Sequence, residues 1–122
     1  MLSSATVAEG SLSRNRIVLI VDDSEVTRAA LTSRLERAGA SVVSASSARD
    51  ALALDASAIA VAIVDVDLGA GDDGVSLADA LTERNPRLRL ALFTGEERTR
   101  SQRTTFRKPD EVDRVIAWAL ED

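Results

Sequence analysis

The 122-residue sequence contains no cysteine and no histidine, and only three of its residues are aromatic (Phe93, Phe106 and Trp118). The absence of cysteine excludes disulfide bonds and thiolate metal sites. The absence of histidine excludes His-ligated zinc, His-dependent catalytic triads and donation of a phosphoryl group from a histidine of this chain. So few rings offer almost no stacking surface for bases or sugars. Any chemistry must therefore depend on carboxylates, hydroxyls, lysine or arginine.

The overall charge and hydropathy limit the possible partners. A formal net charge of -5 argues against a general nucleic-acid binder, which normally carries net positive charge. No apolar run approaches the length of a membrane span, and residues 1–16 lack the features of a signal peptide. We therefore expect a cytoplasmic protein that binds neither nucleic acid nor membrane.

The length and the hydrophobic content of 45% suit a single domain with a substantial core. Residues 1–15 are rich in serine, alanine and glycine and have no convincing period, which predicts a flexible leader. Residues 16–122 are predicted to form the domain.

Short aliphatic segments alternate along the chain with longer amphipathic ones. Strands are expected at 16–21, 40–46, 58–65, 87–93 and 103–107, and helices at 24–39, 48–56, 74–86 and 109–121. The first strand is apolar throughout, which is typical of a strand buried on both faces. The alternation implies right-handed crossovers and a parallel sheet covered by helices on both sides.

Capping residues set the expected helix ends. Ser24 is a candidate N-cap of the first helix, and Gly39 is a candidate C-terminal stop. The inward face of this helix is predicted to carry Val26, Ala30, Leu31, Leu35 and Ala38. The last helix is expected to begin at Pro109, with Asp110 as its cap.

Polar residues follow four of the predicted strands. Asp22 and Asp23 follow the first strand, Asp65 ends the third, Thr94 follows the fourth and Lys108 follows the fifth. In open parallel sheets, ligands bind beyond the carboxyl ends of the strands, where the topology reverses. A single aspartate after a strand is usually a turn former or a helix cap. The whole set at one sheet edge predicts a functional site.

The chemistry of this set favours a metal ion and phosphoryl transfer. Three neighbouring carboxylates repel one another unless a cation is bound, and Mg²⁺ prefers oxygen ligands. A carboxylate such as Asp65 can act as a nucleophile toward phosphorus. Lys108 and Thr94 would then compensate the charge on the phosphoryl oxygens.

Four sequence motifs, "VDDSE", "IVDVDLGAGDDG", "LALFTG" and "FRKPD", occur in this order. With them the chain resembles the receiver domain of two-component response regulators from Arg16 to Leu120. The resemblance implies a flavodoxin-like, doubly wound α/β fold with five parallel strands in the order 2-1-3-4-5, and a cis Lys108–Pro109 peptide. The site residues that it implies are the phosphoacceptor Asp65, the Mg²⁺ ligands Asp22, Asp23, Asp65 and the backbone carbonyl of Asp67, and the phosphoryl contacts Thr94 and Lys108.

The resemblance also implies the partners. The phosphoryl group would come from a histidine kinase or a histidine phosphotransfer protein, and the signal would pass to a separate downstream protein. The chain's own catalysis would be limited to transfer to Asp65 and slow hydrolysis of the acyl phosphate, with Asp67 and Glu96 placed to tune those rates. We expect a monomer or a weak dimer.

The sequence departs from the usual receiver pattern at several positions. Gly69 replaces a common proline, and the loop that follows it is one residue longer than usual. Thr105 stands where many receivers have an aromatic or histidine switch residue. The connection from Thr94 to Lys108 is about two helical turns shorter than usual, which predicts a truncated or missing fourth helix.

The same shortened connection contains Arg98, Arg100, Arg103 and Arg107. The simplest interpretation is a solvated, mobile loop. The alternative is a patch that docks an anion or a partner once Asp65 is phosphorylated, because the added negative charge attracts arginine.

Two other functions remain open at this point. One is a receiver-like interaction module that works without phosphorylation. The other is a small phosphatase of the haloacid dehalogenase type, because "DVD" resembles its nucleophile motif, with Asp67 as the acid/base. In that family, however, the D-x-D strand precedes the acidic pair, whereas here "VDD" comes first.

Overall fold

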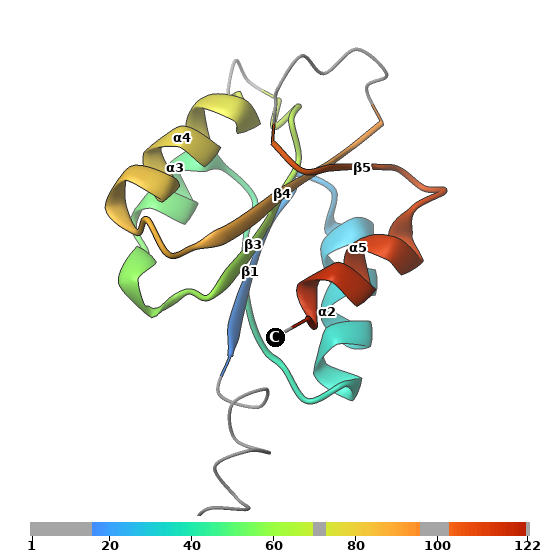
Figure 1. The fold of residues 1–122 in the computed structure, drawn as a ribbon. Helices are drawn as coiled ribbons and strands as arrows, with labels where there is room; N and C mark the ends of the chain where they lie inside the picture. The colour runs from blue at the N-terminus through green and yellow to red at the C-terminus, as the bar shows by residue number, and fades with distance from the viewer. Residues whose placement is uncertain (1–15, 70–72, 96–102, 122) are drawn as a thin grey trace, which may run out of the picture.

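The computed structural model describes residues 16–69, 73–95 and 103–121. The described strands are β1 (Ile17–Val21), β2 (Ser41–Ala45), β3 (Val61–Val64), β4 (Arg89–Thr94) and β5 (Thr105–Arg107). The described helices are α2 (Glu25–Arg37), α3 (Ala48–Leu52), the 3₁₀ turn η1 (Ala56–Ala58), α4 (Gly74–Arg84) and α5 (Val112–Ala119). Elements thus alternate along the chain as the sequence predicts (Figure 1).

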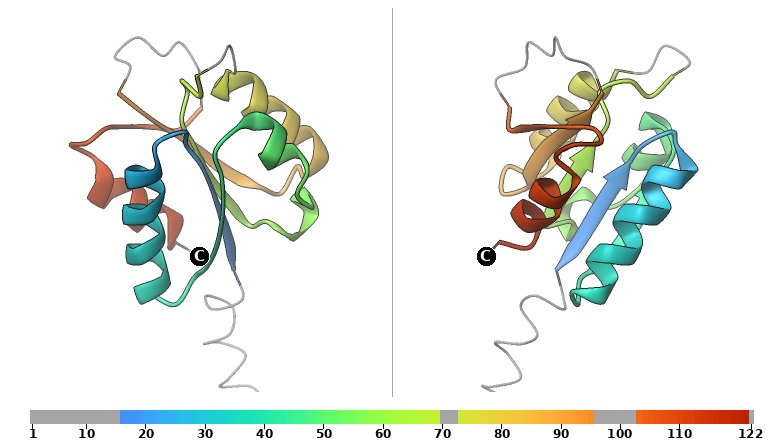
Figure 2. Two further views of the ribbon diagram at one scale, coloured as in Figure 1. Left: turned by 180° about the vertical axis from the view of Figure 1, so that it is seen from behind. Right: turned by 90° about the vertical axis from the view of Figure 1, so that its right-hand side faces the viewer.

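The five strands form one parallel sheet in the order β2-β1-β3-β4-β5. Helices α2 and α5 cover one face, and α3 and α4 cover the other (Figures 1 and 2). The predicted flavodoxin-like fold and strand order are therefore confirmed. Because all strands run the same way, their carboxyl ends meet at one edge of the sheet.

Two apolar layers hold the helices to the sheet. Successive side chains of a strand point to opposite faces of the sheet. In β1, Leu19 therefore lies in the layer beneath α3 and α4, whereas Val18 and Ile20 lie in the layer beneath α2 and α5. Val18, Leu19 and Ile20 are all fully buried, as expected for a central strand. None of the described helices has the length and apolarity that a bilayer crossing requires.

The predicted ends of the first helix are confirmed. The Ser24 side chain accepts a hydrogen bond from the Thr27 N–H, and Gly39 follows the helix with a φ of 98°. The predicted inward face is partly wrong, however. Leu31 and Leu35 are buried, but Val26 is 80% exposed, because α2 turns this position away from the sheet. Of the remaining predicted positions, Ala30 and Ala38 are also exposed.

The prediction for the last helix is also corrected. Helix α5 begins at Val112, and Glu111 occupies the N-cap position instead of Asp110. Glu111 makes no side-chain cap, because its carboxylate accepts from the Arg107 N–H at 2.8 Å and from Arg114 at 3.0 Å. The predicted cis Lys108–Pro109 peptide precedes this helix.

One helix and one connection between strands are shorter than in a standard crossover. The helix expected at 48–56 is limited to α3 and is followed by η1, where Asp55 accepts from the Ser57 N–H. Between β4 and β5, the described residues Gly95, Arg103 and Thr104 are not helical. The connection between these strands is too short for a helix like α2, which confirms the truncation predicted from the sequence.

Candidate functional site

The residues that follow the strands meet at the carboxyl edge of the sheet, as predicted. Asp22, Asp65 and Thr94 are the buried polar residues of the described chain, with exposed fractions of 2%, 6% and 1%. Asp23, by contrast, is exposed to solvent. Burial of two carboxylates and a hydroxyl is costly unless each has a partner. The groups that pair with the two buried carboxylates therefore belong to the site.

Asp22, Asp23 and Asp65 can place one carboxylate oxygen each so that all three lie within 4.8 Å of one another. The Lys108 ammonium bridges the two buried members, at 2.5 Å from Asp22 Oδ2 and 3.2 Å from Asp65 Oδ2. Lys108 is the only lysine in the chain, since every other basic residue is arginine. The lysine ammonium is compact and can lie between two carboxylates. A planar arginine guanidinium would need a different arrangement of the same two groups.

The loop between β1 and α2 holds Asp22 in place through several contacts. The Ser24 N–H donates to Asp22 Oδ1 at 2.9 Å, and the Asp22 N–H donates to the carbonyl of Ala45 at 3.1 Å. The Arg28 guanidinium donates to the Asp22 carbonyl at 2.6 Å. The role of Arg28 was missed from the sequence, because an arginine on an amphipathic helix carries no signal of its own.

The loop after β3 is held by the backbone of α4. The Gly74 N–H donates to the Val66 carbonyl at 2.8 Å, and the Asp67 N–H donates to Asp65 Oδ1 at 3.3 Å. A Cβ on Gly74 would lie 1.9 Å from the Asp65 carbonyl oxygen, so only glycine allows this approach. Gly74 was predicted only as the start of a helix, and its contact with the Asp65 backbone was not predicted.

Asp67 contacts Asp65 through its backbone N–H, and its side chain bonds to the loop that follows. Its carboxylate accepts from the Gly69 N–H at 3.0 Å, and Asp67 forms an isolated antiparallel bridge with Asp73. Gly69 has a φ of 72°, which explains why glycine replaces proline at this position. Glu96, the other residue predicted to tune the reaction, lies outside the described residues.

Burial and charge shift two pKa values at the site. Burial raises the pKa of Asp65, and the nearby Asp22 charge adds to this effect, while Lys108 opposes it. Burial lowers the pKa of Lys108, but its hydrogen bond to Asp22 and the charges of Asp22 and Asp65 outweigh burial and raise it overall. Lys108 is therefore cationic, and the ionised form of Asp65 is less favourable in the folded protein than in the unfolded chain.

This shift predicts a gain in stability when the charge of Asp65 is removed. In EDTA, Asp65→Asn is expected to raise the free energy of unfolding at pH 7.5 by about 1 kcal/mol. A raised pKa penalises the folded state only when the carboxyl is ionised. The gain should therefore be small at low pH, where the carboxyl is mostly protonated in both states, and should increase as the pH rises from the ordinary aspartate pKa to the raised one. Urea unfolding at pH 3.5 and 7.5, followed by Trp118 fluorescence, measures it; a pH-independent loss would contradict the prediction.

The donor set fits a hard divalent cation. All three clustered side chains offer carboxylate oxygens, which are the ligands that Mg²⁺ prefers, and the exposed Asp23 leaves the site open to water. The positive charge that partly balances the cluster in this structure is the Lys108 ammonium.

The shortened connection contributes one defined contact. Arg103 forms an ion pair of 2.7 Å with Asp79 on α4, so this arginine is docked and not simply solvated. Thr105, at the position of the usual switch residue, is exposed and donates to the Arg103 carbonyl. Of the other arginines in the predicted patch, Arg107 is exposed, whereas Arg98 and Arg100 lie outside the described residues.

The chain is thus an α/β domain with a doubly wound parallel sheet, and it carries an acidic site with a lysine at the carboxyl edge of the sheet. The family model of the response regulator receiver domain matches residues 18–113. The chain therefore belongs to the family of response regulator receiver domains. A search of curated proteins finds no match.

Solved structures agree with this assignment. A response regulator from Burkholderia pseudomallei, crystallised with a phosphorylated aspartic acid, a calcium ion and citrate, is 31% identical with a TM-score of 0.75; the match covers 87% of this chain and 66% of that protein. The receiver domain of NtrX from Brucella abortus is 26% identical with a TM-score of 0.71, over 84% of this chain and 97% of that domain. A CheY-like receiver domain from Methanospirillum hungatei is 21% identical with a TM-score of 0.73, over 86% and 93%, which shows the shared fold.

Proposed function

We propose that Asp65 is the phosphoacceptor of this receiver domain and that its phosphorylation depends on Mg²⁺. The observation that carries the proposal is the position of Asp65. Its carboxylate is buried at the end of β3, inside the acidic cluster, and lies 3.2 Å from the Lys108 ammonium. A carboxylate placed beside a fixed cation suits attack on a phosphoryl group, whose charge that cation would balance.

The proposed transfer is a single displacement at phosphorus. An Asp65 oxygen forms a bond to phosphorus while the bond from phosphorus to the donor breaks, and the donor leaves with that electron pair. Lys108 pairs with one phosphoryl oxygen, and Thr94, buried at the end of β4, donates to another. Asp22, Asp23, Asp65 and the Asp67 carbonyl would hold Mg²⁺. The bound ion would supply positive charge that favours the ionised, nucleophilic form of Asp65.

The donor that we propose is a phosphohistidine on a kinase or a phosphotransfer protein, since this chain has no histidine. A groove of 210 Å³ beside Lys108 and Pro109 supports a protein donor, because the exposed Val26 and the side chains of Ala30 and Phe93 give it an apolar lining. An exposed apolar surface next to a reactive group is typical of a protein contact. The proposed place of action is the cytoplasm, and the proposed output is a contact with a separate downstream protein.

The test is the intact mass of the protein after incubation with acetyl phosphate, with Mg²⁺ and with EDTA. We expect a gain of one phosphoryl group only with Mg²⁺, and the same gain from a phosphorylated histidine phosphotransfer protein. A gain in EDTA would contradict the dependence on Mg²⁺. No gain from either donor would favour the alternative, an interaction module that works without phosphorylation.

A further inference from the structure

We propose that Arg28 is a positioning residue for the metal-binding loop, and that its guanidinium sets the relative orientation of the Asp22 and Asp23 carboxylates. The inference rests on the proposed function, because it assigns Arg28 a role toward Mg²⁺ in the same site. It goes further in naming a residue that provides none of the ligands.

The contact is short and directional. The Arg28 side chain donates to the Asp22 carbonyl at 2.6 Å, which is closer than the usual N–H···O distance of about 2.9 Å. The backbone of the same residue closes the first turn of α2, since the Arg28 N–H donates to the Ser24 carbonyl at 3.0 Å. Arg28 thus ties the rigid start of the helix to the end of β1 across the loop.

The position of this bond explains its effect. The Asp22 carbonyl belongs to the planar peptide unit that joins Asp22 to Asp23. Fixing the direction of this carbonyl fixes the plane that ends at the Asp23 Cα, and so restricts the directions in which the Asp23 side chain can leave the backbone. Asp22 itself is held by Ser24 and Lys108, but Asp23 is exposed and accepts no hydrogen bond among those found for the described residues. Its placement therefore depends on the loop backbone.

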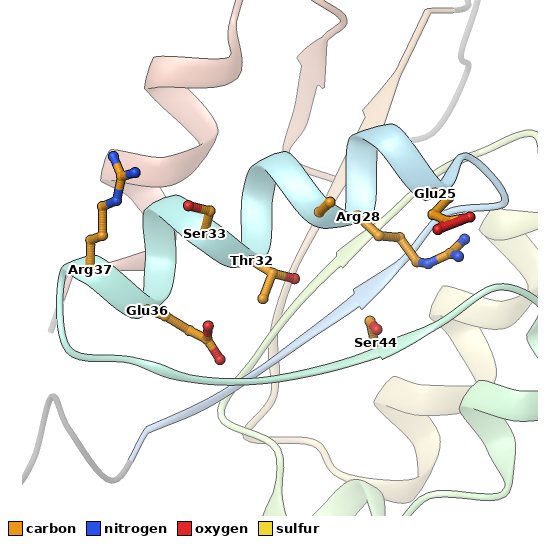
Figure 3. Close-up of a pocket in the computed structure, with 8 residues that line it drawn as sticks. Glu25, Arg28, Thr32, Ser33, Glu36, Arg37 and Ser44 are labelled. Carbon is orange, nitrogen blue, oxygen red and sulfur yellow. The ribbon is translucent and has the colours of Figure 1, made fainter.

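The surroundings of Arg28 leave its side chain free to reach the site. Arg28 lines an open groove between α2 and β2, together with Glu25, Thr32, Glu36 and Arg37. Figure 3 shows its guanidinium at the Glu25 end of the groove, toward the end of β1, while Arg37 lies at the opposite end of the helix. The side chain is therefore directed along the helix to the site.

Electrostatics alone would predict the opposite effect. A fixed positive charge near a cation site repels the cation, so Arg28 would weaken Mg²⁺ binding if its charge were all that mattered. A positioning role predicts tighter binding in its presence, because an oriented loop needs less ordering when the ion binds. The two explanations therefore predict changes of opposite sign when the guanidinium is removed.

The experiment is Mg²⁺ titration by calorimetry of the wild type, Arg28→Met and Arg28→Lys, with Arg37→Met as the matched control. Arg37 lies on the same helix and lines the same groove, but it is nine residues from Arg28 and about 13 Å away along the axis. We expect Arg28→Met to weaken Mg²⁺ binding roughly tenfold. Arg28→Lys keeps a donor and should lie between the wild type and Arg28→Met, and Arg37→Met should match the wild type.

A second measurement separates positioning from a general loss of structure. With acetyl phosphate as donor, the Mg²⁺ concentration for half-maximal phosphorylation should rise in Arg28→Met, while the acetyl phosphate requirement at saturating Mg²⁺ should not change. Unchanged or tighter Mg²⁺ binding by Arg28→Met overturns the inference, as does equal weakening by Arg37→Met. If the wild type binds no Mg²⁺, the proposed function and the inference about Arg28 both fail. If the wild type binds Mg²⁺ and Arg28→Met binds it equally well, only the inference about Arg28 fails.

Discussion

Asp65→Asn is expected to abolish phosphorylation by acetyl phosphate in Mg²⁺, with no phosphoryl gain detectable by intact mass. Asparagine has nearly the same shape, but its amide lacks the nucleophilic carboxylate oxygen and the charge that a cation would bind. The effect should be complete, because Asp65 is the one member of the acidic cluster at the end of β3. The variant should remain folded, since the substitution removes a buried charge.

Asp67→Asn is the matched control for this experiment. Asp67 lies two residues from Asp65, but it is exposed, and its carboxylate caps the Gly69 N–H. We expect this variant to gain the phosphoryl group as the wild type does, with at most a changed rate. Loss of phosphorylation in Asp67→Asn would instead indicate an acid/base role, as in a phosphatase with a D-x-D nucleophile motif. Phosphorylation of Asp65→Asn would show that another residue is the acceptor.

Gly74→Ala is expected to lower the free energy of unfolding by about 3 kcal/mol or more. An alanine Cβ would lie 1.9 Å from the Asp65 carbonyl oxygen, 2.7 Å from its carbon and 2.8 Å from the Val66 Cα. All three are backbone atoms, so no side-chain rotation relieves the clash. Either α4 moves away from the sheet or the end of β3 shifts, and a shift would also slow phosphorylation of Asp65.

Gly95→Ala provides the comparison. Gly95 follows Thr94 at the same edge of the sheet, but among the described residues no atom beyond its chain neighbours lies within 4 Å of the position that its Cβ would occupy. Its φ is outside the left-handed region, so we expect a change of no more than about 0.5 kcal/mol. Urea unfolding followed by the fluorescence of Trp118, the only tryptophan, measures both variants. Equal stabilities would show that the close packing of Gly74 on Asp65 is not maintained in solution.

The fold was largely predictable because it depends on local patterns. Continuous aliphatic runs and amphipathic segments alternate, and this alternation alone implies a parallel sheet. Ser24 and Gly39 mark the ends of α2 by their own backbone and side-chain chemistry. The predictions that failed concern residues whose environment is set by contacts that the pattern of residue types does not show. Val26 is exposed because α2 directs it away from the sheet, and Glu111 takes the N-cap position that Asp110 was predicted to occupy.

The sequence by itself determined the candidate site, because the carboxyl ends of parallel strands must meet at one edge of the sheet. Asp22, Asp65 and Lys108 could be placed there from the order of the strands alone. Only the tertiary structure decided which contacts hold them. The bond from Arg28 to the Asp22 carbonyl and the packing of Gly74 on the Asp65 backbone depend on distances of a few ångströms between helix and sheet. No pattern of residue types specifies such distances, because they follow from the packing of whole elements against one another.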